Sequence, residues 1–241
     1  MTQDGQEACL RAIRKALSSE RLDAYGIGRS DDEKLANYFW NLALCESLYP
    51  SLHGLEVALR NALFDAGRAL FPGLATRDVH CWLDADPPVI LIDERTAVDL
   101  AKRRLLDRRK PLEPGRLVAE LSFGFWTALF DVRYEQSRIL WPRLFSARLL
   151  DAGCPRSMRS RKALSPLLNR IRHLRNRVFH HEPIWHWNDL AQQHQLALEM
   201  IGWFSPALRA TIEPNDRFAS IHAAGAAPFH EHVRSFLMMP R

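Results

Sequence analysis

The amino-acid sequence predicts an all-α fold, on three observations. Apolar residues recur at helical spacing along most of the 241 residues. The one strand candidate is the apolar run from Val89 to Ile92, which is equally typical of a loop packed on a core. The composition, 47% hydrophobic and 25% charged, is that of an ordinary globular protein with a buried core.

The first periodic segment predicts two helices, over residues 33–48 and 52–70. We place the break at Pro50, because proline removes a helical hydrogen bond and clashes with the preceding turn. Ser30 or Asp31 is expected to cap the first of these helices.

The second half of the chain is predicted to be helical as well. One helix lies between Asp93 and Pro111, and residues 115–145 are apolar and aromatic at helical spacing. Residues 164–181 and 188–204 give two further helices. Four aromatic side chains are expected in the core: Phe123, Phe125, Trp126 and Phe130.

A chain of this length favours one domain with short appendages. We place the domain at residues 22–212, after an N-terminal extension at 1–21. Residues 213–241 are expected to form a loosely ordered C-terminal tail, since they contain three prolines and a glycine.

The sequence favours a cytoplasmic protein without a membrane anchor. The first twenty residues mix acids with bases and lack a long apolar core, and the longest apolar runs are too short to span a bilayer. The four cysteines are scattered without a CxxC pair, which is typical of reduced thiols.

The positive charge is clustered. Residues 156–177 contain eight Lys or Arg and no acid, and residues 102–110 contain six bases and one acid. Such clusters favour a polyanionic partner, through release of its counterions, or simply form the solvated face of a helix.

One arginine lies where the helical pattern of residues 164–181 expects a hydrophobe. On a wheel at about 100° per residue, Arg175 falls inside the apolar arc. An unpaired buried charge is costly, so a carboxylate or a ligand is expected beside it. The members of the arc are Leu164, Leu167, Leu168, Ile171, Leu174, Val178 and Phe179.

A carboxylate at the edge of another apolar arc offers a partner. Glu56 lies there in the predicted helix over 52–70, with Arg60 one turn later. We therefore predict a contact between Glu56 and Arg175.

In the predicted helix over residues 164–181, the side opposite the apolar arc carries a row of polar residues. Arg172, Asn176 and His180 follow at i, i+4 and i+8, with His180 about 140° round from Arg175 on an ideal helix. Pro183 disfavours helical geometry just before it, so we expect the helix to end near His180 and its imidazole to swing toward Arg175. A forked cation, an amide and a titratable imidazole form a suitable set for handling a phosphate.

The stretch "RNRVFH" at residues 175–180 resembles the signature of the HEPN superfamily: an arginine, a polar residue and a histidine at the end of a helix. Three further segments, "LEVALRNAL", "LSFGFWTALF" and "IGWFSPALRATIEPNDRF", extend the likeness. With "LRNRVFHHEPIW" they are similar in order and spacing to the Abi-like branch, the AbiD/AbiF type of bacterial abortive-infection proteins. The resemblance covers residues 22–221.

The resemblance implies an all-helical HEPN-like bundle with additional helices, and a ribonuclease that needs no metal or cofactor. It implies that Arg175 binds the scissile phosphate, that Asn176 orients the phosphate or the histidine, and that a histidine acts as general acid or base. His180 and the adjacent His181 both fall within the spacing of the motif; we favour His180, with His181 in a supporting role. The product is then a cyclic phosphate end. A homodimer with two motifs at its interface, a role as an anti-phage toxin and an antitoxin or other regulatory partner are further implications.

The remaining polar residues receive lesser roles. Glu56 and Arg60 are expected to support the site, and three arginines are expected to contact the RNA backbone: Arg170, Arg172 and Arg177. A structural Arg175 paired with Glu56 and a catalytic Arg175 are compatible if the arginine spans the rim of a cleft.

Three alternatives stay open. The chain is a non-catalytic HEPN module that binds RNA or protein, a purely structural helical protein, or a metal protein. The metal site would use four histidines, which lack acids or cysteines at obvious ligand spacing apart from Glu182 and Asp189: His180, His181, His186 and His194.

Overall fold

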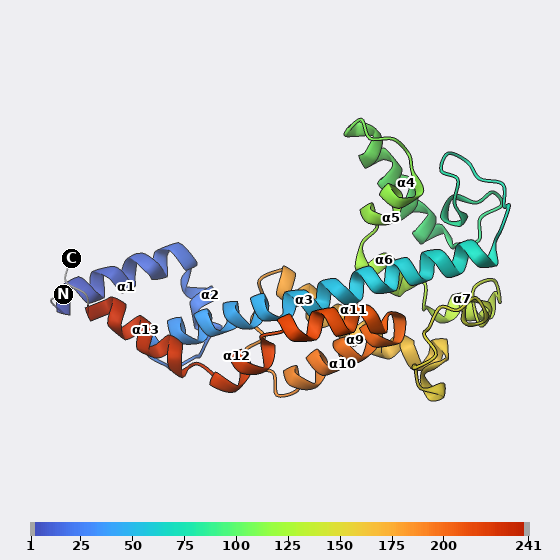
Figure 1. Cartoon of the computed structure of the whole chain (residues 1–241). Coiled ribbons are helices and arrows are strands. Elements are labelled where there is room, and N and C mark those ends of the chain that lie inside the picture. Colours follow the sequence, from blue (N-terminus) through green and yellow to red (C-terminus); the bar gives the residue numbers. More distant parts are fainter. Residues whose placement is uncertain (1–2, 239–241) are drawn as a thin grey trace. The chain divides into compact units, whose positions relative to one another are not determined.

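The computed structural model describes residues 3–238, and this part of the chain is all-α (Figure 1). It contains helices and, outside them, an isolated bridge between Thr76 and Ala85, but no strand. The all-α prediction is confirmed, and the apolar run at 89–92 leads directly into a helix. No helix within residues 3–238 has the length and apolar character needed to cross a membrane.

The α-helices are α1 (Gln3–Leu17), α2 (Ser19–Asp23), α3 (Asp31–Leu70), α4 (Ile92–Asp107), α5 (Pro114–Glu120), α6 (Phe123–Ala128), α7 (Val132–Gln136), α8 (Arg143–Ser146), α9 (Arg161–Phe179), α10 (Leu190–Phe204), α11 (Pro206–Ile212), α12 (Phe218–Ala224) and α13 (Ala227–Met238). Three short 3-10 helices lie at Trp82–Asp84, Arg156–Met158 and Glu213–Asn215.

The described residues form two compact units. Unit 1 contains residues 3–50, 174–194 and 215–238, and unit 2 contains residues 51–173 and 195–214. Three long helices, α3, α9 and α10, contribute residues to both units.

The predicted break at Pro50 is wrong, because α3 runs through it as one helix of 40 residues. Proline inside a helix costs about 3 kcal/mol. Leu48 and Leu52, on either side of it, are 0% and 2% exposed, and burial of each such side chain contributes about 1.5–3 kcal/mol. Packing therefore offsets the lost hydrogen bond, although the boundary between the two units still falls at Pro50.

The start of α3 has the predicted serine cap. The backbone N–H and hydroxyl of Ser30 donate to the Glu33 carboxylate, and its carbonyl accepts from Lys34. The bond from the Ser30 N–H to Glu33 is the carboxylate half of a capping box, and it satisfies a backbone donor where the helix begins.

The expected loose tail from residue 213 onward is instead helical over most of its described part, which ends at residue 238. In unit 1, α13 lies beside α1 (Figure 1), and Val233 and Leu237 of α13 share a small core with Leu22 and Leu35. Phe218 of α12 is buried too. Apolar residues at helical spacing thus outweigh Pro214, Gly225 and Pro228, because these three lie at or between helix ends. Pro240 lies outside the described residues.

The aromatic segment forms the core of unit 2, as predicted. Phe123, Phe125, Trp126 and Phe130 are between 0% and 6% exposed. The indole N–H of Trp141 donates to the Leu129 carbonyl at 2.7 Å, which satisfies its one polar group in the core.

Unit 2 also buries an ion-pair network, which sequence reasoning missed. The Asp84 carboxylate is 0% exposed; it accepts from Lys102 at 2.8 Å and from the backbone N–H groups of Asp78 and Val79. Burial by itself raises the pKa of Asp84, but the hydrogen bonds from Lys102 and the two amides outweigh it and hold that pKa below its usual value. The network fastens the loop before α4 to that helix.

All four cysteines are free thiols. Burial raises the pKa of Cys45 to about 11, and it also raises the pKa values of Cys81 and Cys154. These thiols therefore stay protonated and unreactive near neutral pH.

Candidate active site at the end of α9

The helix α9 ends in a fixed turn within unit 1. After Phe179, the N–H of His181 donates to the Val178 carbonyl at 3.2 Å, and the N–H of Glu182 donates to the Arg177 carbonyl at 2.8 Å. His181 has a φ of 59°, the left-handed conformation that glycine commonly adopts at this position. The predicted helix end is confirmed, and it is a Schellman motif closed by a histidine.

His180 stays in helical register with Asn176. Its N–H donates to the Asn176 carbonyl at 2.8 Å, and both side chains are exposed. The expectation that Pro183 lets His180 swing toward Arg175 is not met, because the chain turns one residue later, at His181. The separation of about 140° around the helix between Arg175 and His180 therefore persists.

Arg175 is half-buried, and its guanidinium lies 4.3 Å from the centroid of the Phe179 ring. Phe179 itself is 39% exposed and lies 5.9 Å from the ring of Tyr49. The prediction that Phe179 faces the core is therefore wrong. Its ring offers a π-face to the cation instead, which is worth about 0.5–1 kcal/mol at an exposed site.

The rest of the apolar arc is confirmed. Leu174 and Val178 in unit 1 are buried, as are Leu164, Leu168 and Ile171 in unit 2, while Leu167 is partly buried. The helix therefore keeps one buried face, and Arg175 lies on its margin.

Arg177, expected to contact the RNA backbone, is engaged within the turn instead. Its guanidinium pairs with Glu182 at 3.1 Å, donates to the Pro183 carbonyl at 2.9 Å and lies 5.4 Å from the Trp187 ring centroid. These contacts tie the end of α9 to the segment that follows it.

Asn41 holds that following segment, and sequence reasoning missed it. This α3 residue is 2% exposed, and its side-chain oxygen accepts from the backbone N–H groups of Ile184 at 2.8 Å and Trp185 at 3.1 Å. A lone amide within the apolar run "YFWNLAL" was the available signal, because a buried amide needs hydrogen-bond partners.

A second clamp comes from Arg21, whose guanidinium donates to the carbonyl of His181 at 2.7 Å. Behind Asn41, the buried Tyr25 accepts from the Asn41 amide through its hydroxyl oxygen at 3.4 Å. Burial raises the pKa of Tyr25 to about 12, with a smaller opposing effect from Arg21. The turn after α9 is thus held by a neutral acceptor, the Asn41 side-chain oxygen, and by a cationic donor, the Arg21 guanidinium.

The other predicted site residues belong to unit 2. Glu56, Arg60 and Arg172 are half-buried, and Arg170 is exposed. The contact between Glu56 and Arg175 stays a prediction, because the two residues belong to different units.

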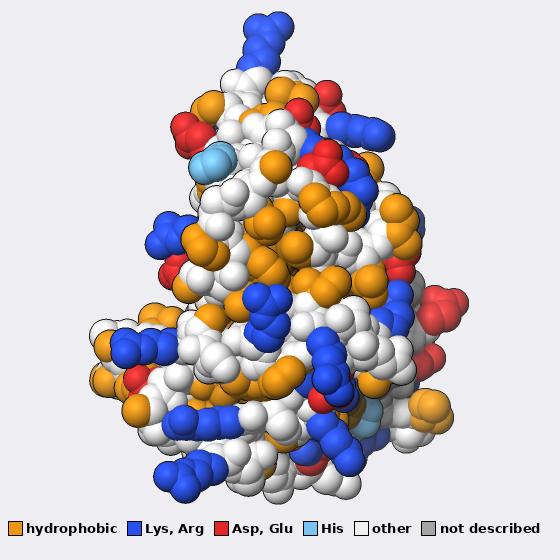
Figure 2. Space-filling model, turned by 90° about the vertical axis from the view of Figure 1, so that its right-hand side faces the viewer, with side chains coloured by type: hydrophobic (Ala, Val, Ile, Leu, Met, Phe, Trp, Pro, Cys, Tyr) orange, Lys and Arg blue, Asp and Glu red, His pale blue; other side chains and the backbone are white. Residues whose placement is uncertain are grey.

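The two units differ in charge. Unit 2 has 22 Lys and Arg against 16 Asp and Glu, a net charge of +6, whereas the sequence of unit 1, counted from residue 1 to residue 241, has 11 against 12, a net charge of −1. Figure 2 shows Lys and Arg side chains spread over one face with hydrophobic side chains between them. The exposed cations of unit 2 are Arg68, Arg103, Arg104, Arg108, Arg109, Lys110, Arg116, Arg133, Arg138, Arg143, Arg148, Arg156, Arg159, Lys162 and Arg170.

The histidines of the metal alternative do not gather. Between residues 3 and 238, no group of three His, Cys, Asp or Glu side chains is arranged to hold a metal ion. His194 pairs with Asp216 at 2.7 Å and stacks on Phe218 with the ring centroids 4.3 Å apart, so it fastens the C-terminal segment to α10.

Comparison of the chain with protein-family models, with curated proteins and with solved structures finds no match. The geometry at the end of α9 and the resemblance of its motif are therefore the basis for assigning a function.

Proposed function

We propose that this chain is a metal-independent endoribonuclease of the HEPN type, with an Abi-like helical bundle and additional helices. It would act in the bacterial cytoplasm as a toxin or abortive-infection effector against phage. One observation carries the proposal: Arg175, Asn176 and the exposed His180 lie on the last turns of one helix whose end is held in place from both sides.

The chemistry follows from these groups. His180 as base takes the proton of a ribose 2′-hydroxyl, the 2′-oxygen attacks phosphorus, and the 5′-oxygen leaves with a proton from an acid, giving a 2′,3′-cyclic phosphate and a 5′-hydroxyl. Arg175 stabilises the negative charge that builds on the phosphoryl oxygens, while the Asn176 amide donates to one of them. An exposed imidazole suits this role because water and RNA can both reach it.

The angle between Arg175 and His180 favours a site shared by two copies of the chain. Two side chains about 140° apart on one helix do not converge on a single phosphate. In a homodimer with two-fold symmetry, the arginine of one copy can face the histidine of the other.

Complementation tests this arrangement. Arg175→Ala and His180→Ala proteins, each inactive alone, are unfolded and refolded together. A shared site predicts recovery of about a quarter of the wild-type activity, since half of the dimers are mixed and each has one intact site. No recovery from a confirmed mixed dimer would contradict the shared site.

The cleavage assay tests the proposal itself. With chelator present, we expect the wild type to cut RNA, His180→Ala to lose about 10²–10⁴-fold, and Arg175→Ala to lose about 10²–10³-fold. His186→Ala, which removes another exposed histidine, is the matched control and should keep full activity. Circular dichroism checks that Arg175→Ala still folds.

Cleavage that needs a divalent metal, or that survives both substitutions, would overturn the mechanism. Overproduction in bacteria gives a second readout: the wild type should slow growth and His180→Ala should not. A cell that tolerates the wild type would then need an antitoxin or another restraint.

The charge of unit 2 favours one alternative, a non-catalytic HEPN module that binds RNA or protein. A net charge of +6 is sufficient for salt-dependent RNA binding without any chemistry. Equal RNA binding by wild type and His180→Ala, with no cleavage by either, would establish this alternative.

A further inference from the structure

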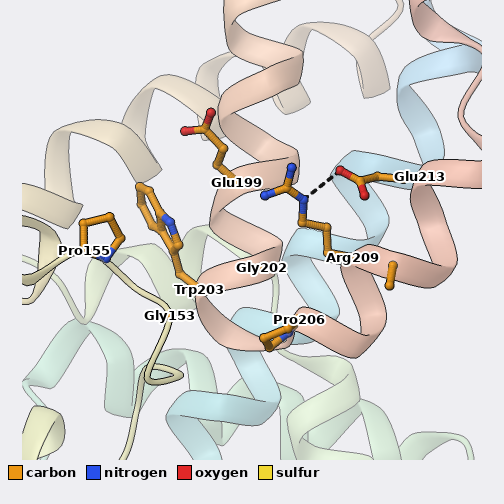
Figure 3. A pocket seen from close by; sticks show the side chains of 9 residues that line it. Gly153, Pro155, Glu199, Gly202, Trp203, Pro206, Arg209 and Glu213 are labelled. Carbon is orange, nitrogen blue, oxygen red and sulfur yellow. Dashed lines mark hydrogen bonds and ion pairs between the residues drawn. The ribbon is translucent and has the colours of Figure 1, made fainter.

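A pocket of about 420 Å³ is lined by residues of unit 2 alone, and none of them is a candidate residue of the proposed active site. This volume lies within the usual range of about 300–1,000 Å³ for small-molecule sites. Figure 3 shows its main side chains: Pro155 and Trp203 on one side, Arg209 and Glu213 on the other, with Glu199 near the rim.

The aromatic wall of the pocket is preformed. The N–H of Asp151 donates to the Trp203 carbonyl at 2.7 Å, which joins the loop before Pro155 to the end of α10. Arg159 donates to the carbonyls of Ala152 at 2.7 Å and Cys154 at 3.1 Å. The loop that carries Pro155 is therefore fixed from within, and ligand binding would not have to order it.

Gly202 forms the floor, because it has no side chain. A Cβ placed there would come within 2.9 Å of Cδ and 3.5 Å of one Nη atom of Arg209. The side chain of Arg209 therefore lies against the backbone of α10 at Gly202. Its Nε donates to the carboxylate of Glu213 at 2.7 Å. The hollow between Trp203 and Arg209 exists because position 202 is glycine.

The polar groups of the pocket select a ligand with N–H donors. Glu199 and Glu213 outnumber the single cation Arg209, and the pocket lies at the C-terminal end of α10, the negative end of its dipole. Glu199 accepts one hydrogen bond, from Gln195 at 3.2 Å, and a carboxylate can accept several. A phosphate is disfavoured here, whereas a planar group with adjacent N–H donors fits.

We propose that this pocket binds an unpaired guanine base of the RNA. Trp203 stacks on the base, and the Glu199 carboxylate accepts from its neighbouring N1–H and N2–H groups. Arg209 donates to O6, the acceptor beside N1. The inference rests on the proposed ribonuclease function for its biological meaning, and the exposed cations of unit 2 would hold the flanking phosphates.

Nucleosides test the pocket without any cleavage. In equilibrium dialysis of the full chain, guanosine should bind at least about tenfold more tightly than inosine, which lacks only the N2 amino group. Adenosine should bind as weakly as inosine or more weakly. Nucleosides carry no phosphate, so the net charge of unit 2 does not contribute to these differences.

Two variants locate the binding. Glu199→Gln should weaken guanosine binding about tenfold, and Gly202→Ala should abolish it by filling the floor. Glu113→Gln, at an exposed glutamate of unit 2, is the control and should bind like the wild type. Because alanine favours helix more than glycine does, Gly202→Ala should keep its helical content.

The outcomes separate this inference from the proposed function. Specific guanosine binding without RNA cleavage would retain the pocket and overturn the ribonuclease. RNA cleavage with equal guanosine and inosine binding, or with no effect of Glu199→Gln, would overturn the pocket alone. Tighter binding of an arginine-containing peptide than of guanosine would also overturn it, in favour of a protein partner.

Discussion

Units 1 and 2 use different interactions to hold their key segments. Unit 2 has a net charge of +6 and fastens its loop with the buried Asp84–Lys102 pair. Unit 1 has a net charge of −1, and there the neutral amide of Asn41 and the cation of Arg21 hold the candidate active site. Positive charge and candidate chemistry therefore lie in different parts of the chain, so RNA affinity and RNA cleavage should respond to different mutations.

The largest expected effect is on the ion network of unit 2. Asp84→Ala leaves the backbone N–H groups of Asp78 and Val79 without their acceptor and removes one of the three carboxylates around Lys102. Because removing one partner of a buried ion pair costs about 3–5 kcal/mol, we expect a loss of this size. Urea unfolding measures this loss. Asp65→Ala is the control: its pair with Arg68 is exposed, so we expect a loss of at most about 1 kcal/mol. Similar losses for both variants would contradict the role of burial.

The same network predicts acid sensitivity. The pKa values of Asp84 and Asp99 are lowered: burial raises each, but hydrogen bonds from Lys102 to Asp84 and from Arg77 to Asp99 outweigh it. Their stabilisation is therefore present above the unfolded-state pKa of about 3.9 and is lost as the pH falls through the lower folded values. Unfolding below about pH 4 should depend less on pH in Asp84→Ala than in the wild type.

The corresponding change in unit 1 is Asn41→Ala, which leaves the buried N–H of Ile184 and the partly buried N–H of Trp185 without their acceptor. We expect a loss of about 1–3 kcal/mol, with faster hydrogen exchange at these two amides. Asn61→Ala, at an exposed position of the same helix, is the control. Cleavage should fall as well, since the end of α9 loses one of its two clamps; unchanged exchange at Ile184 would refute the clamp.

The smallest expected effect is a gain. His181→Gly places glycine at a left-handed position, which should stabilise the chain by about 0.5–1 kcal/mol in thermal unfolding. The same variant identifies the catalytic histidine, because it removes one imidazole without straining the backbone. If His180 is catalytic, as we propose, His181→Gly retains cleavage; a loss comparable to that of His180→Ala would assign the role to His181.

Sequence reasoning located most of the helices but misjudged their limits. It predicted a break at Pro50 and a loose tail at residues 213–241, because a sequence directly displays each residue's intrinsic preference for helix but not the free energy of tertiary packing. In the fold, the buried leucines beside Pro50 and the apolar residues of α12 and α13 outweigh that propensity. The candidate site was found through Arg175 and His180, whereas Asn41 and Arg21 were missed because they meet the site from more than 130 residues away in sequence.

The sequence by itself determined the all-α class, the aromatic core around Trp126 and the end of α9 near His180, since each follows from periodicity or from a nearby proline. Only the tertiary structure decided that His181 makes the turn, that Arg177 is an internal clamp and that Gly202 leaves a pocket beside Trp203. The physical reason is that backbone turns, ion pairs and hollows depend on which distant groups meet. That pairing is settled by packing, and helical spacing does not encode it.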